Sequence, residues 1–201
     1  MKYWKSITGI ILVAIVVVLF ISYRSSWISD PKPTSTDSGE TAQDIPEVFV
    51  TQVSRAVRFQ YSTSYILTEK EVGNAERTHY VITLVKASDA QNGDKENSEG
   101  PRAITFDFYQ NKEKFTPEQW VKQSAFSNFK LSPDGKLEQI PFAGGPAVSY
   151  RWDGLYSGQS LVTTTSGDIL MISVTYDGDS DKRLEDYNKL LSTVEFVGIV
   201  R

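Results

Sequence analysis

The sequence predicts an α+β fold, a three-layer α/β/α sandwich around a mainly antiparallel central sheet, preceded by one transmembrane helix. Three observations predict this fold class. Residues 7–23 form an uncharged, almost entirely apolar run, and the strand-like segments that follow are mostly consecutive rather than alternating with helices. Two amphipathic helical segments each need a sheet face to cover, and one helix on each face gives three layers.

The uncharged run at residues 7–23 has the length of a transmembrane helix. As a helix it is about 26 Å long, close to the thickness of a bilayer's hydrocarbon core. No pair of small residues follows it at the spacing of a signal-peptidase site, which favours an uncleaved anchor over a signal peptide. Lys2 and Lys5 lie in the short tail, residues 1–6, so the positive-inside rule predicts a cytoplasmic N-terminus and an exported remainder.

Residues 24–46 are expected to form a flexible linker, and residues 47–201 a single extracytoplasmic domain. The linker is rich in Pro, Ser and Thr and has too few apolar side chains to build a core. The chain has 21 Lys and Arg against 25 Asp and Glu, a net charge of −4, which argues against nucleic acid as a charge-driven partner. It contains no cysteine, which excludes disulfides, thiolate nucleophiles and cysteine zinc sites.

Strands dominate the first half of the domain. Residues 102–109 alternate apolar and polar side chains, as a half-buried strand does. Residues 80–87 are apolar on both faces and are expected in the centre of the sheet, antiparallel to 102–109. The other predicted segments are a short strand or turn at 47–53, strands at 57–61 and 65–68, and a polar turn at 69–78.

A helix is expected to begin after Thr116. Thr116 is a suitable N-cap, Pro117 fits the first helical position, and Gln119 completes a capping box. Apolar side chains continue from Trp120 to Phe129, so the helix is expected to reach Phe129 before a turn ends the region.

The second half is expected to contain four strands, a helix and a closing strand. Ser166 and Gly167 predict a tight turn that joins two strands into a hairpin. Residues 181–193 have apolar side chains at the spacing of an amphipathic helix. The predicted strands are 136–140, 147–152, 159–165, 168–176 and 195–199, and the apolar helix positions are Leu184, Tyr187, Leu190 and Leu191.

Short motifs occur along the domain in a fixed order. They are residues 59–65 (FQYSTSY), 116–121 (TPEQWV), 144–147 (GGPA) followed by Tyr150, and 168–174 followed by 187–196 (YNKLLSTVEF). Together they resemble the PsbP-like family, named for an extrinsic subunit of photosystem II. The resemblance implies an α/β/α sandwich with a non-enzymatic binding or assembly role. Ser62 stands where the family usually has proline, and an anchor replaces a soluble targeting peptide, so photosystem partners are not carried over.

The residue patterns predict no catalytic residue, no metal site and no cofactor. His79 is the sole histidine and has no ligand-type residue at short spacing, so an ordinary residue at the edge of a strand is expected. Residues 177–181 (DGDSD) resemble the start of a calcium loop, but the twelfth position is Asn188 rather than Glu. An acidic turn that caps the last helix explains them better. Glu69, Glu71 and Glu76 could supply a carboxylate pair for acid–base catalysis, but on a polar turn they are expected to be solvated.

Arg151, Trp152 and Tyr156 are the predicted partner-binding residues. Arg, Trp and Tyr are enriched in binding hot spots, and these three cluster at a strand end. The alternative is that Trp152 packs in the core and Arg151 pairs with an acid. The sequence thus favours a membrane-anchored extracytoplasmic binding or assembly module without catalytic activity, with the bilayer and a protein as partners. The alternatives are a small-ligand or calcium sensor and a carboxylate-based hydrolase.

Overall fold

A computed structural model of the chain describes residues 47–55, 57–74, 78–90 and 100–197. The predicted tail at 1–6, transmembrane span at 7–23 and linker at 24–46 lie outside these ranges. Within them, no helix combines the length and apolar character needed to cross a membrane.

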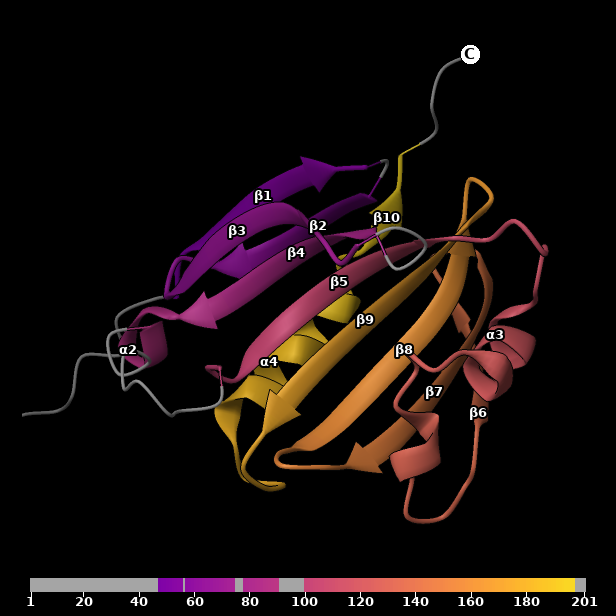
Figure 1. Cartoon of the computed structure of the whole chain (residues 1–201). Coiled ribbons are helices and arrows are strands. Elements are labelled where there is room, and N and C mark those ends of the chain that lie inside the picture. Colours follow the sequence, from indigo (N-terminus) through magenta and orange to yellow (C-terminus); the bar gives the residue numbers. More distant parts are fainter. Residues whose placement is uncertain (1–46, 56, 75–77, 91–99, 198–201) are drawn as a thin grey trace, which may run out of the picture. The chain divides into compact units, whose positions relative to one another are not determined.

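A seven-stranded sheet in which every neighbouring pair is antiparallel forms the centre of the fold (Figure 1). The predicted pairing of the strands at 80–87 and 102–109 is confirmed, and so is the hairpin at Ser166 and Gly167. Both turn residues have positive φ, 47° and 95°, as a two-residue hairpin turn of type I′ requires. In spatial order the strands are β3 (Tyr65–Val72), β4 (His79–Lys86), β5 (Ala103–Gln110), β9 (Asp168–Tyr176), β8 (Ser157–Thr165), β7 (Gly145–Asp153) and β6 (Glu138–Phe142).

One helix covers each face of this sheet. On β9, Leu170, Ile172 and Val174 belong to a core with helix α4 (Lys182–Leu191), and the alternate residues belong to a second core with helix α3 (Pro117–Gln123). Because neighbouring residues of a strand point to opposite faces, the two cores lie on opposite sides of the sheet. Figure 1 shows α4 behind the sheet and α3 in front of it, which is the predicted three-layer arrangement.

A separate three-stranded sheet packs one of its faces against the core that contains α4. Its order is β1 (Phe49–Ser54), β2 (Val57–Ser62) and β10 (Glu195–Phe196). Val57 and Phe59 point into the α4 core, and the Phe59 ring stacks on Phe106 with centroids 4.3 Å apart. The prediction of a single sheet is therefore incomplete. Of the closing strand predicted at 195–199, Glu195 and Phe196 pair with β2 instead of the central sheet, and residues 198 and 199 lie outside the described ranges.

Helix α3 is shorter than predicted. The capping box at Thr116 is present, but the helix ends at Gln123 and Ser124 is already extended. The Ser127 hydroxyl donates to the carbonyls of Val121 and Ser124, at 2.7 and 3.0 Å, and so satisfies groups that another helical turn would have used. Phe129 lies instead in the 3-10 turn η2 (Phe129–Leu131).

Strand β3 is longer than predicted. The segment expected as a polar turn continues the strand to Val72, paired with β4, and Gly73 makes the turn with φ 92°. Glu69, Lys70 and Glu71 are exposed here, which suits an edge strand because charged side chains block further pairing. After β4, a single helical turn, α2 (Ala87–Ala90), begins the loop to β5.

Candidate binding cavity beside helix α4

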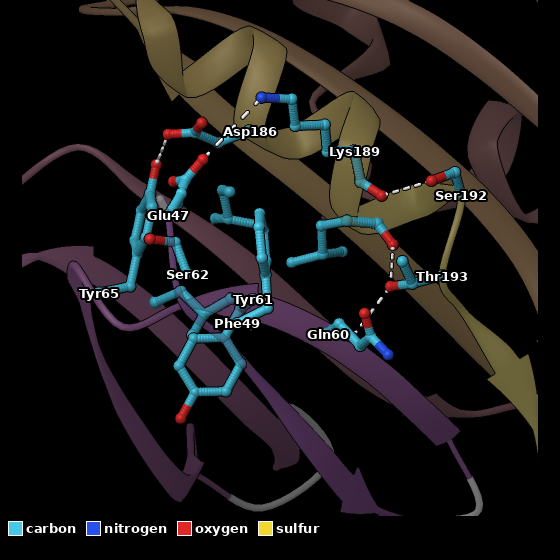
Figure 2. A pocket seen from close by; sticks show the side chains of 13 residues that line it. Glu47, Phe49, Gln60, Tyr61, Ser62, Tyr65, Asp186, Lys189, Ser192 and Thr193 are labelled. Atoms are coloured by element: carbon cyan, nitrogen blue, oxygen red, sulfur yellow. Dashed lines mark hydrogen bonds and ion pairs between the residues drawn. The ribbon is translucent and has the colours of Figure 1, made fainter. Parts of the chain in front are cut away.

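A cavity of about 180 Å³ lies between β2, the start of β3 and the C-terminal half of α4 (Figure 2). Apolar side chains of Leu84, Ile104 and Leu190 line it. An apolar cavity of about 150 Å³ holds a benzene molecule, so this one has room for a single ring or one Leu-sized side chain. Its polar lining residues include Glu47, Gln60, Ser62, Lys189, Ser192 and Thr193.

The cavity lies where β2, which pairs with β1 along its whole length, has no strand partner among the described residues on its other edge. Strand β10 pairs with β2 only at Val57 and Arg58. Beyond them, the backbone N–H of Gln60 donates to the Thr193 hydroxyl at 2.9 Å, and that hydroxyl donates to the Leu190 carbonyl at 2.8 Å. The end of α4 is thereby attached to β2 by hydrogen bonds, leaving space where a third strand would otherwise pack.

Asp186 is the buried acceptor at one end of the cavity. Its side chain is 8% exposed and accepts from the Tyr65 hydroxyl at 2.8 Å and from Lys182 at 2.9 Å, with Lys86 at 3.2 Å. Burial alone raises the pKa of Asp186, but the bonds from Lys182, Tyr65 and Lys86 outweigh burial, and its pKa is lowered. The carboxylate is therefore ionised at neutral pH.

Tyr65 keeps its proton for a related reason. Burial, and then the hydrogen bond to the Asp186 anion, raise the pKa of its phenol. At the mouth, Glu47 lies 3.9 Å from both Lys182 and Lys189. Because the pKa of Asp186 is lowered and that of Tyr65 is raised, this pair keeps its protonation states near neutral pH, which suits holding a ligand better than transferring a proton.

The acidic turn at 177–181 caps α4, as the sequence indicated. Asp181 accepts from the Arg183 backbone N–H at 2.9 Å, and the buried Arg183 guanidinium also binds Asp89 at 2.9 Å. Asp177 pairs with Arg102. The described part of the chain contains no group of three or more His, Asp or Glu side chains placed to hold a metal ion.

His79 begins β4, and its Nε2 lies 3.3 Å from Asp107 of the neighbouring strand β5. Its ring stacks on Tyr109 at 4.4 Å, beside a wide, open cleft of about 970 Å³ that Trp120 and Phe126 also line. Sequence reasoning missed Asp107 because only the pairing of β4 with β5 brings the two side chains together.

The structure does not gather Arg151, Trp152 and Tyr156 into one patch. Arg151 and Trp152 are consecutive on β7, so their side chains point to opposite faces. Trp152 donates to the Ser160 hydroxyl at 2.9 Å and packs against the α3 core. Arg151 is exposed, 3.9 Å from Asp179, and the Tyr156 ring lies 5.8 Å from the Arg102 guanidinium. A partner contact through these three residues stays a prediction.

Sequence reasoning also missed Tyr65 and Asp186, which line the cavity. One signal was available for Asp186. It lies four residues before Leu190, on the apolar face of an amphipathic helix, and a carboxylate in that position needs partners.

No protein-family model matches the chain, and no curated protein matches it. Among solved structures, it is similar to the solution structure of cyanobacterial PsbP from Synechocystis sp., with a TM-score of 0.50 over 79% of this chain and 98% of that one. The fold is PsbP-like. The sequence identity is 8%, so the likeness concerns the fold alone. The fold implied by the four sequence motifs is thereby confirmed, whereas family membership is not shown.

Proposed function

We propose that this PsbP-like domain is a non-catalytic binding module that acts by contact with another protein. The cavity beside α4 is the observation that carries the proposal. Its apolar lining and fixed charges provide a site for one apolar side chain of a partner, with Glu47 and Lys189 at the mouth to contact polar groups around that side chain.

We further propose that the domain is anchored in a membrane on the extracytoplasmic side and is distantly related to the PsbP-like family. The apolar run at residues 7–23 supports a membrane anchor with a cytoplasmic N-terminus, and residues 24–46 support a linker that lets the domain reach partners on the extracytoplasmic side. The four motifs together with the PsbP-like fold support a distant kinship with the PsbP-like family.

A small-ligand sensor is the second candidate, because the same cavity also has the size of a single aromatic ring. A carboxylate-based hydrolase is less well supported. Asp186 accepts from three donors, and an acid–base catalyst needs a carboxyl group free to exchange its proton with a substrate.

Site-specific crosslinking in native membranes tests the proposal. A photoreactive residue replaces the exposed Ser192 at the mouth, and we expect a discrete adduct with one protein. A second substitution, Lys189→Trp, fills the mouth and is expected to abolish the adduct. The control Lys70→Trp makes the same change on the exposed edge of β3 and is expected to retain it.

No adduct, or an adduct that survives Lys189→Trp, contradicts binding of a protein at this cavity. A small molecule retained in native mass spectrometry and lost with Lys189→Trp supports the sensor instead.

A further inference from the structure

Strand β1 presents an edge of exposed apolar side chains. It is the outer strand of the three-stranded sheet, and among the described residues no strand pairs with its free edge. Val48, Phe49, Val50 and Val53 are 60%, 46%, 39% and 54% exposed, which is unusual for four apolar residues in one short segment.

The other sheet edges in the described ranges are protected in familiar ways. Strand β3 has the charged run Glu69 to Glu71, β6 has Glu138 and Pro141, and β10 is only two residues long. Strand β1, with the sequence FVTQVS, contains no charge and no proline. The edge of β1 is thus open to pairing with a further strand.

The side chains of β1 divide into an inner and an outer row. Gln52 and Ser54 hydrogen-bond to Glu69 of β3, at 2.8 and 3.2 Å, so the even-numbered residues face the central sheet. By alternation, Phe49, Thr51 and Val53 form the outer row.

We propose that the occupant is a second copy of this chain, whose β1 pairs antiparallel with the first across a two-fold axis at Thr51. This two-fold axis is perpendicular to the sheet, so it keeps each side chain on its own face. Residues opposed across the new pair must therefore come from the same face, which requires the axis to pass through a residue rather than between two residues. With the centre at Thr51, Phe49 lies opposite Val53 twice, and Thr51 lies opposite itself. Aromatic–β-branched and Thr–Thr pairs are favourable cross-strand pairs.

Charge complementarity selects the same arrangement. Glu47 precedes β1 and Arg55 follows it, so antiparallel copies place opposite charges opposite each other at both ends of the paired strands. Within one chain, Glu47 already lies 3.9 Å from Lys182 and Lys189, and Arg55 lies 3.5 Å from Glu71, so the second copy joins these existing charge groups. Two chains that each carry a net charge of −4 repel, and the uncharged β1 is an edge where they approach without like charges opposed. At the edge of β3, by contrast, self-pairing would juxtapose glutamates. Phe49 also lines the cavity beside α4, so the proposed pairing and the cavity share this residue.

Single-cysteine crosslinking of the full chain in membranes tests this pairing, because the natural chain has no cysteine to compete. Thr51→Cys places two thiols on the proposed axis, where opposed Cβ atoms are about 5 Å apart. We expect oxidation to give a disulfide-linked homodimer. The control Thr68→Cys is also exposed but lies on the edge of β3, where charged side chains block strand pairing. It is expected to form the disulfide about tenfold more slowly or not at all.

Two further variants complete the test. Adding Val53→Lys, at an exposed outer-row position, is expected to slow dimer formation by Thr51→Cys about tenfold, since both Phe49–Val53 pairs are lost. Adding Lys70→Trp, on the charged edge of β3, is expected to leave dimer formation unchanged. Equal rates for Thr51→Cys and Thr68→Cys, no effect of Val53→Lys, or crosslinking of Thr51→Cys to a different protein would each overturn the proposal.

Discussion

Asp186→Ala removes the acceptor that joins α4 to β3 and β4. The buried Tyr65 hydroxyl loses its partner, which costs about 1–3 kcal/mol. The Lys182 side chain is 54% exposed and can turn to water, so losing its ion pair costs about 0–1 kcal/mol. The Lys86 side chain is only 20% exposed, so losing its ion pair costs at least as much. We expect a total loss of about 3 kcal/mol, which lowers the Tm by roughly 6–12 °C in a domain of this size.

Urea unfolding followed by tryptophan fluorescence measures this loss. Tyr65→Phe is the matched variant, because it removes only the hydroxyl that Asp186 accepts from. The double variant is expected to be about 1–3 kcal/mol more stable than Asp186→Ala alone, because the buried hydroxyl that lacked a partner is gone. A loss below about 1 kcal/mol for Asp186→Ala, or strictly additive single effects, would refute the assigned role of this carboxylate.

Three further predictions concern other groups. The pKa of Asp186 is lowered in the folded state, so its ionised form stabilises the fold above the pKa of about 4 of an unfolded aspartate. The difference in free energy of unfolding between the natural chain and Asp186→Asn should be constant near neutral pH and shrink as the pH falls below about 4. A difference that grows on acidification would contradict this. Gly158→Ala places a methyl group where the Trp152 ring lies and should lower the free energy of unfolding, measured by thermal denaturation, by about 2 kcal/mol. Gly154→Ala should lower it clearly less, because the nearest atom to the added methyl group is 3.7 Å away. Calcium should not change the Tm, because Asp177, Asp179 and Asp181 pair with arginines, and a shift abolished by Asp179→Ala would favour a calcium sensor.

Local signals in the sequence predicted local structure well. The capping box at Thr116 and the turn at Ser166 and Gly167 each depend on a few neighbouring residues, and both occur as expected. The alternation in 102–109 identified β5 because a half-buried strand imposes a period of two. These signals predicted an antiparallel central sheet with a helix on each face, but not the order of all its strands.

The candidate site depends on contacts that no local pattern encodes. Tyr65 and Asp186 are 121 positions apart, and only the docking of α4 brings them together. The end of α3 depends on Ser127, which bonds backward to two carbonyls, whereas the apolar pattern alone indicated a longer helix. The exposed glutamates of β3 were interpreted as a turn because charge that protects a sheet edge resembles charge in a loop.

The cavity remains open because α4 is attached at three points along its length. Arg183 binds Asp89 near its start, Asp186 binds Tyr65 in the middle, and Thr193 binds the backbone of Gln60 beyond its end. Protein cores normally close voids, and a cavity left open costs about 24 cal/mol per Å³. A helix held by only one of these contacts could pivot into the space. With all three present, the cavity is preformed, and a partner that fills it loses less conformational entropy on binding than one that must first open it.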